Sequence, residues 1–177
     1  MYATLDNPVD TLVPFSHGVA KDPEPCLETR KLRRPRILLA EDDQEMRRFL
    51  TETLRRSGYN VMEVRNGYGM LDFIGKGLAS EAGIDLDLVI SDIRMPGANG
   101  LRILSALHSH CPTLPVILIT AFGNPETHEE AKLRGAIAVL DKPFSLNELL
   151  AILQYALQRK NTTRKGPGLH DPERSNQ

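Results

Sequence analysis

Acidic side chains follow two of the most apolar runs of this sequence, at the points where the runs end. Glu41 and Asp42 come directly after RILLA, and Asp92 comes directly after DLVIS. If the ends of these runs meet in space, three carboxylates crowd together and resist joint ionisation unless a cation joins them. Carboxylate oxygens are ligands that suit a hard dication, so this pattern predicts a Mg²⁺ site.

Two further residues with useful chemistry end apolar runs, Thr120 after PVILI and Lys142 just past the last run. A lysine supplies a fixed positive charge, and a threonine supplies a hydroxyl donor. Carboxylate, metal, lysine and hydroxyl together describe a phosphoryl acceptor in which Asp92 attacks phosphorus and holds the group as an acyl phosphate. Lys142 and the metal would offset charge on the equatorial oxygens, and Thr120 would donate a hydrogen bond to one of them.

Each of these residues taken alone has an ordinary structural explanation. A lone aspartate such as Asp92 is often a turn or cap residue. A lone threonine such as Thr120 is usually a hydrogen-bonded hydroxyl at a strand end, and a lone lysine such as Lys142 is usually a surface residue. Asp43 needs nothing beyond a helix cap to explain it. The coincidence of the other residues at the ends of successive apolar runs favours a site.

The elements that would position these residues alternate along the chain. Short apolar runs of strand length are separated by segments with helical periodicity. Strands are predicted at 36–40, 59–64, 87–91, 115–120 and 137–141, and helices over the segment from Met46 to Leu54, at 68–79, at 100–109, from Asn124-Pro125 and from Ser145. Continuously apolar strands that alternate with helices indicate an α/β fold with a parallel sheet covered on both faces. Ligands of such doubly wound sheets bind beyond the carboxyl ends of the strands, where the candidate residues stand.

Composition and charge argue against several classes of protein. Lys and Arg number 22 against 23 for Asp and Glu, so the overall charge favours neither a nucleic-acid binder nor a membrane binder. The two cysteines form no C-x-x-C pair, and no apolar stretch is long enough to span a membrane, so we expect a cytoplasmic protein. Residues 1–34 and 161–177 are polar and lack periodicity, and we interpret them as a disordered arm and a disordered tail around a domain at 35–160.

Four motifs, in order and at the expected strand ends, carry a resemblance to a known family. ILLAEDD, VISDIRMPGANG, ILITA and LDKPF together resemble the receiver domain of bacterial two-component response regulators, the CheY-like family. The resemblance runs from about Arg36 to Arg159. It implies a flavodoxin-like sheet of five parallel strands in the order 2-1-3-4-5 with five helices on the two faces.

The resemblance also implies a set of roles. Asp92 would be phosphorylated by a histidine kinase or a phosphotransfer protein, and Thr120 would be the switch residue. Mg²⁺ would be bound by Asp92, Asp42 and the backbone carbonyl of Arg94, with Glu41 contributing through water. Such a protein is not an enzyme beyond catalysing its own phosphorylation and dephosphorylation. The peptide bond between Lys142 and Pro143 would be cis.

Several positions depart from the family pattern or could tune it. Val139 stands where the family usually has the switch tyrosine or phenylalanine, and Glu41 replaces the commoner aspartate. Arg94 and Phe122, two places after the phosphoacceptor and the switch threonine, flank the path of attacking water. We predict that the bulky Phe122 slows self-dephosphorylation.

Three alternatives compete with a stand-alone receiver that docks on a downstream target. The first is an interaction module that keeps the fold but has lost phosphorylation, which Val139 keeps open. The second is a phosphatase of the haloacid-dehalogenase type, which would need an aspartate at the position of Arg94. The third is a DNA-binding regulator, which we do not expect because the basic segment KLRRPR is short. The surface formed by the helix from Pro125, strand 137–141 and the last helix is the expected docking face, and it would also suit a homodimer.

Overall fold

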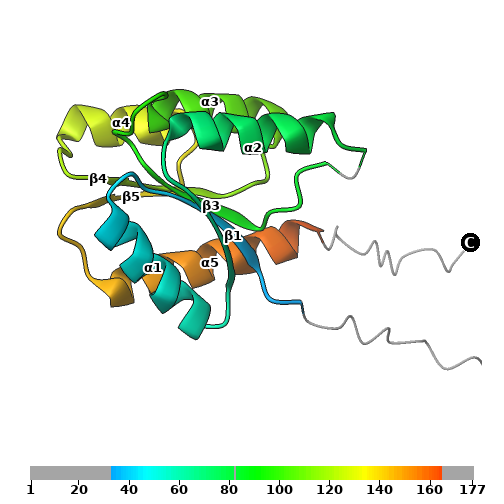
Figure 1. The fold of residues 1–177 in the computed structure, drawn as a ribbon, viewed down its shortest axis with the longest axis horizontal. Coiled ribbons are helices and arrows are strands. Elements are labelled where there is room, and N and C mark those ends of the chain that lie inside the picture. Colours follow the sequence, from blue (N-terminus) through cyan, green and yellow to red (C-terminus); the bar gives the residue numbers. More distant parts are fainter. Residues whose placement is uncertain (1–32, 82, 165–177) are drawn as a thin grey trace, which may run out of the picture. The chain divides into compact units, whose positions relative to one another are not determined.

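A parallel β-sheet with helices on both faces is the framework of this computed structural model, which describes residues 33–81 and 83–164 (Figure 1). The strands are β1 (Arg36–Ala40), β2 (Asn60–Val64), β3 (Leu88–Asp92), β4 (Val116–Thr120) and β5 (Ala138–Asp141). The helices formed by the described residues are α1 (Gln44–Arg56), α2 (Gly67–Ala79), α3 (Gly100–His110), α4 (Pro125–Leu133) and α5 (Leu146–Arg164). All strand pairs are parallel, and the order is β2-β1-β3-β4-β5. The predicted fold class and strand order are confirmed.

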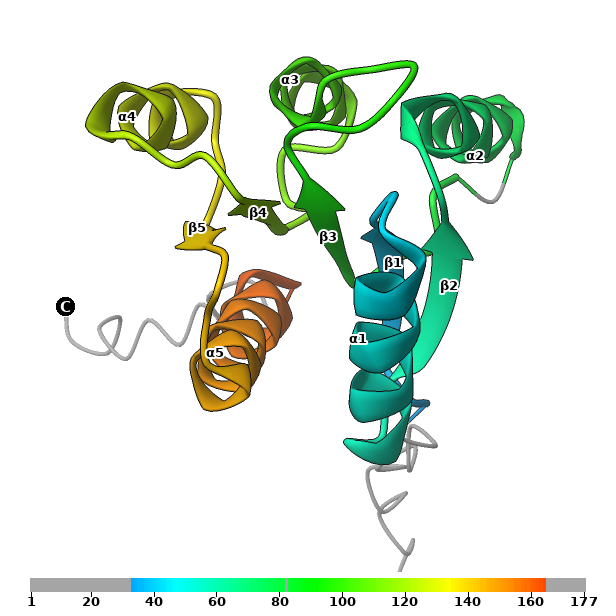
Figure 2. The same ribbon diagram turned by 60° about the vertical axis from the view of Figure 1, so that its left-hand side comes forward.

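Helices α2, α3 and α4 cover one face of the sheet, and α1 and α5 cover the other (Figures 1 and 2). Successive strand residues point to opposite faces, so each buried strand must be apolar at every position. In β1, Leu38 and Ala40 pack on the side of α2 and α3, whereas Ile37 and Leu39 pack on the side of α1 and α5. This explains why the strands read as continuous apolar runs.

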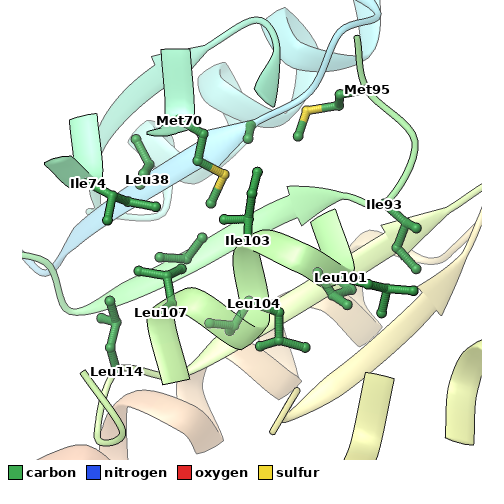
Figure 3. Close-up of a cluster of buried hydrophobic side chains, with 14 of the residues drawn as sticks. Leu38, Met70, Ile74, Ile93, Met95, Leu101, Ile103, Leu104, Leu107 and Leu114 are labelled. Atoms are coloured by element: carbon green, nitrogen blue, oxygen red, sulfur yellow. The ribbon is translucent and has the colours of Figure 1, made fainter. Parts of the chain in front are cut away.

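Two hydrophobic cores, one on each face, hold the layers together. Figure 3 shows the core beneath α2 and α3, where Met70, Ile74, Ile103 and Leu107 pack against Leu38. The second core joins α1 and α5 to the other face and includes the fully buried residues Leu50, Leu54, Leu149 and Leu153. Burying one such side chain contributes about 1.5–3 kcal/mol to folding, so the cores fix the sheet as a rigid platform for the residues at its edge.

The observed boundaries agree with the predicted ones to within a few residues, with one larger difference. The helix α5 continues to Arg164, four residues past the domain end predicted at 160. Of the predicted arm and tail, residues 1–32 and 165–177 lie outside the described residues. Among the helices that are described, none is both long and apolar enough to cross a lipid bilayer.

Side chains cap the helices that follow the candidate site residues. The carboxylate of Asp43 accepts a hydrogen bond from the Met46 amide at 2.7 Å, which confirms its interpretation as a cap. Asn124 caps α4 in the same way, through the Thr127 amide at 2.7 Å. The peptide bond between Lys142 and Pro143 is cis, as the resemblance implied.

Candidate functional site

Two acids and a lysine are in direct contact at the carboxyl ends of three strands. Glu41 directly follows β1, Asp92 ends β3, and Lys142 directly follows β5. The ammonium of Lys142 donates hydrogen bonds to Asp92 Oδ2 at 2.6 Å, to Glu41 Oε1 at 2.9 Å and to Glu41 Oε2 at 2.8 Å. The three residues are separated by 50 to 101 positions in the chain. The parallel sheet joins them because β1 pairs with β3 and the peptide N–H of Lys142 donates to the Thr120 carbonyl at the end of β4.

The oxygens of Glu41, Asp42 and Asp92 converge on one point. One carboxylate oxygen from each residue lies within 4.8 Å of the other two. Glu41 and Asp92 are buried, with 1% and 5% of their surface exposed, whereas Asp42 is exposed and leaves one side open to solvent. Lys142 offsets only part of the negative charge, and an all-oxygen set of carboxylates suits a hard dication. The residues present therefore fit the predicted Mg²⁺ site.

Burial and mutual contact shift the ionisation of this group. The pKa of Glu41 is raised above 4.5, mainly because burial disfavours the carboxylate, even though the hydrogen bond from Lys142 acts in the opposite direction. Burial acts to lower the pKa of Lys142, but its hydrogen bonds to Asp92 and Glu41 outweigh burial and raise that pKa above 10.5. Lys142 thus stays charged at neutral pH and holds the two acids in place.

Thr120 and Val139, the predicted switch positions, lie on neighbouring strands. Thr120 is 1% exposed and ends β4, one residue beyond the partner of Asp92 in β3. Its hydroxyl oxygen accepts a hydrogen bond from the Phe122 amide at 3.1 Å. Val139 pairs with Leu118 and packs against the core beneath α3 and α4, so an aliphatic side chain fills the position of the family's ring.

Arg94 contacts the site through its backbone, and its exposed side chain contacts Phe122. Its amide donates to Asp92 Oδ1 at 2.8 Å, whereas Lys142 Nζ donates to Oδ2, so each oxygen of the carboxylate has a donor. Its guanidinium carbon lies 4.5 Å from the centre of the Phe122 ring. The two residues predicted to flank the water path therefore contact each other. The metal-ligand role of the Arg94 carbonyl stays a prediction.

The loop between β3 and α3 places Asp92 by a close approach of backbones. The Gly100 amide donates to the Ile93 carbonyl at 2.9 Å, and Asn99 caps α3 by accepting from the Leu101 amide. Gly97 has a φ of +94°, a backbone conformation that residues with a Cβ atom rarely adopt. The glycines of MPGANG let the chain turn sharply directly after the carboxylate.

Arg47 belongs to the site, and our sequence analysis did not identify it. Its guanidinium Nη1 donates to the backbone carbonyl of Glu41 at 2.7 Å and to that of Asp42 at 3.2 Å. The available signal was its place in the first turn of the helix capped by Asp43. A long side chain there reaches back over the turn that precedes the helix.

A cavity of about 450 Å³ opens beside these residues on the side of α1. Lys142 and Asp43 line its polar end, and Met46 and Phe49 line its apolar part, with Phe49 53% exposed. The cavity thus opens the Lys142 side of the site to solvent.

Comparisons with known proteins agree with this geometry. Residues 37–154 match the profile of the family described as response regulator receiver domain. The chain is similar to Regulatory protein AtoC of Escherichia coli (strain K12), with 36% identity over 135 residues, which cover 76% of this chain and 28% of AtoC. It is also similar to DNA-binding transcriptional regulator NtrC of Azospirillum brasilense, with 34% identity over 121 residues that cover 68% of this chain and 24% of NtrC. The chain thus spans about a quarter of the length of these relatives.

Solved structures show the same fold over nearly their whole length. The signal receiver domain of an HD domain-containing protein from Pseudomonas fluorescens Pf-5 has a TM-score of 0.66 and 27% identity, and the match covers 76% of this chain and 94% of that one. The chemotaxis protein CheY4 of Vibrio cholerae has a TM-score of 0.61 and 29% identity, with coverage of 70% and 99%. The described domain therefore corresponds to one complete unit of this kind.

Proposed function

Because this chain belongs to the response regulator receiver domain family, we propose that it acts in two-component signal transduction by accepting a phosphoryl group on Asp92. One observation carries the proposal. The Asp92 carboxylate lies 2.6 Å from the Lys142 ammonium and within a group of three carboxylates whose ligand oxygens lie within 4.8 Å of one another. A buried nucleophile, a fixed cation and an oxygen-ligand site for a dication are the parts that phosphoryl transfer needs.

The chemistry proceeds by displacement at phosphorus. An oxygen of Asp92 forms the new P–O bond while the P–N bond of a donor phosphohistidine breaks, and the imidazole nitrogen leaves with the bonding pair. Lys142 is placed to stabilise negative charge on the transferring group. The buried hydroxyl of Thr120, which follows the β4 partner of Asp92, would donate to the acyl phosphate. Mg²⁺ held by Glu41, Asp42 and Asp92 would add positive charge at the same oxygens.

The partners in this proposal are a histidine kinase or phosphotransfer protein and a downstream target. The cavity lined by Lys142 opens the lysine side of the site to a donor side chain. The target, or a second copy, would dock on the surface formed by α4, β5 and α5, which phosphorylation would shift between two populated conformations. Location in the cytoplasm and the lack of any further enzymatic activity are part of the same proposal.

A contact between α4 and β5 offers a route for the signal that does not need a switch ring at Val139. His128 Nε2 on α4 lies 2.9 Å from Asp141 Oδ1, and Asp141 directly precedes Lys142. A movement of the backbone at Thr120 or Lys142 would therefore reach α4 through this pair.

The receiver could act alone or control a further domain. The relatives are relevant to this question because this chain matches only about a quarter of their length. We favour docking on a separate target. The NtrC relatives are DNA-binding transcriptional regulators by name, so they give no support to our expectation that DNA is not a partner.

The test is phosphorylation by a small-molecule donor. Acetyl phosphate and Mg²⁺ should add one phosphoryl group to the wild type, and intact-protein mass spectrometry measures it. Asp92→Asn should add none. Asp72→Asn is the matched control, since it makes the same change in charge at an exposed carboxylate on α2 that pairs with Lys76.

The outcome also separates the proposal from its alternatives. A wild type that binds Mg²⁺ but takes up no phosphoryl group would favour a phosphorylation-independent interaction module. Steady turnover of phosphate esters would favour a phosphatase, a reading that Arg94 disfavours because it occupies the position of the required general acid.

A further inference from the structure

Asp42 differs from the other two acids of the site in how it is held. Glu41 and Asp92 are fixed by the ammonium of Lys142, and Asp92 also accepts a hydrogen bond from the Arg94 amide. The Asp42 side chain is exposed, and no hydrogen bond from the described part of the chain reaches its carboxylate. The direction of this carboxylate therefore depends on the backbone that carries it.

Arg47 holds that backbone on both sides of Asp42. Its Nη1 donates to the Glu41 carbonyl at 2.7 Å and to the Asp42 carbonyl at 3.2 Å. These carbonyls belong to the two peptide planes that flank the Asp42 Cα, so fixing both planes fixes the direction of its Cα–Cβ bond. The helix in turn fixes Arg47, whose amide donates to the Asp43 carbonyl at 2.9 Å.

We propose that Arg47 is a positioning residue for the divalent cation site, acting by aiming the Asp42 carboxylate at Glu41 and Asp92. The inference rests on the proposed function, because it concerns the same site. In other metal sites, residues that form hydrogen bonds with the metal ligands set the orientation of those ligands. Mutation of such a residue weakens metal affinity by about 10- to 100-fold.

A purely electrostatic role of Arg47 would give the opposite result. A guanidinium near a dication repels it, so removing the charge would strengthen Mg²⁺ binding. Positioning predicts weaker binding in the same variant. The sign of the change therefore decides between the two roles.

The experiment titrates Mg²⁺ into the full chain and measures heat by isothermal titration calorimetry. Arg47→Ala should raise the Kd for Mg²⁺ by about 10-fold. Arg47→Lys, which keeps the charge and a single donor group, should lie between Arg47→Ala and the wild type. The matched control is Arg48→Ala on the same helix turn, because Arg48 is 80% exposed and pairs with Glu52. Its Kd should stay within about twofold of the wild type.

A second measurement separates positioning from a general loss of structure. With acetyl phosphate as donor, Arg47→Ala should need about 10-fold more Mg²⁺ for half-maximal phosphorylation of Asp92 but should reach a rate near that of the wild type at saturating Mg²⁺. Asp92 keeps its contacts with Lys142 and the Arg94 amide in this variant, which is why the maximal rate is retained.

Each outcome bears on the inference. A Kd of Arg47→Ala equal to that of Arg48→Ala, or lower than that of the wild type, overturns it while the proposed function stands. A maximal rate that falls along with Mg²⁺ affinity also overturns it, because the lesion then reaches beyond Asp42. A wild type that fails to bind Mg²⁺ overturns both the inference and the metal site of the proposed function.

Discussion

Lys142 is the cation that allows two buried acids to lie side by side. Glu41 is 1% exposed and Asp92 5% exposed, and both are hydrogen-bonded to the Lys142 ammonium. Removing one partner from a buried ionic group leaves the remaining charges without compensation, which costs about 3–5 kcal/mol in well-buried examples. A carboxyl can relieve this cost by taking up a proton, so the effect of losing Lys142 depends on pH.

The first prediction concerns Lys142→Met in Mg²⁺-free buffer. Loss of the ammonium removes the contacts that lower the pKa of Glu41, so this pKa rises further above 4.5 in the folded state. A carboxyl with a raised folded pKa binds more protons in the folded state, so stability is highest below the unfolded pKa and falls as pH rises through the folded pKa. We expect a loss of about 3 kcal/mol near pH 8 and a clearly smaller loss near pH 5.

Urea denaturation of both proteins at the two pH values, with chelator present, measures this difference. The titration of Lys142 itself does not enter, because its pKa lies above 10.5 and it stays charged throughout this range. A loss of stability that is equal at both pH values would contradict the assignment of Glu41 as the proton acceptor.

The second prediction concerns Phe122, which is 63% exposed and contacts the guanidinium of Arg94. Phe122→Ala removes this contact and opens the route of water to the acyl phosphate on Asp92. An exposed cation–π contact is worth about 0.5–1 kcal/mol, which corresponds to a phosphoryl lifetime about two- to fivefold shorter. Decay of the phosphorylated protein, followed by intact mass after removal of acetyl phosphate, measures it.

Tyr155→Ala is the matched control for this experiment. Tyr155 is also exposed and also contacts an arginine, Arg159, but it lies on α5 and not in the segments that follow β3 and β4. Its lifetime should equal that of the wild type. An unchanged lifetime in Phe122→Ala would remove Phe122 from the path of water.

At the scale of residues, the sequence predicted the groups that perform chemistry better than the groups that orient them. Glu41, Asp92 and Lys142 could be predicted because each ends an apolar run, and parallel strands bring their carboxyl ends to one edge. Arg47 could not be predicted, because its role lies in hydrogen bonds to backbone carbonyls. These hydrogen bonds depend on the conformation of the turn at Asp42. The contact between His128 and Asp141 is hidden for the same reason.

At the scale of elements, the junction of β3 and α3 has little tolerance for added atoms. A Cβ at Gly100 would lie 2.6 Å from the Asp92 carbonyl oxygen and 2.9 Å from the Ile93 Cα. Both neighbours are backbone atoms of the segment that carries the phosphoacceptor, so they can move only if Asp92 moves with them. The close approach of α3 to the end of β3 thus sets the position of Asp92.

The third prediction contrasts alanine at this junction with alanine in open space. Gly100→Ala should destabilise the protein by about 1–3 kcal/mol through overpacking and should slow phosphorylation of Asp92. Gly75→Ala on α2 has no atom within 4 Å of the new Cβ, and alanine there should stabilise by about 0.5–1 kcal/mol. Thermal unfolding of the two variants should shift in opposite directions. A Gly100→Ala protein as stable as Gly75→Ala would show that the junction is not tightly packed.

The boundaries of helices and strands could be predicted where apolar periodicity was strong. The prediction failed where this periodicity stopped. The strands were located within about two residues because most of their buried positions are apolar. The last helix extends beyond its apolar pattern, and there Lys160, 8% exposed, donates to the Leu86 carbonyl at 2.5 Å, which joins the helix to the segment just before β3. A charged residue in a polar segment gives no sign of such a contact in advance.

At the scale of the whole molecule, the site and the stability of the fold are thermodynamically linked. The three carboxylates come from the ends of β1 and β3, which adjoin in the folded sheet but lie about 50 positions apart in the chain. An unfolded chain does not hold these oxygens together, so Mg²⁺ binds the folded state preferentially. Any ligand that binds only the folded state stabilises it by RT ln(1 + L/Kd), where L is the free ligand concentration.

The fourth prediction follows from this linkage. Mg²⁺ at about 100 times its Kd should raise the free energy of unfolding by about 2.7 kcal/mol, and chelation should reverse the gain. Asp42→Asn should abolish most of the gain without lowering the stability of the metal-free protein, because the Asp42 side chain is exposed and one of three mutually repelling charges is removed. Urea denaturation with and without Mg²⁺ measures both quantities. An equal gain in the wild type and in Asp42→Asn would mean that the ion stabilises the chain through other groups, and the oxygen cluster at the ends of β1 and β3 would then lose its assignment as the metal site.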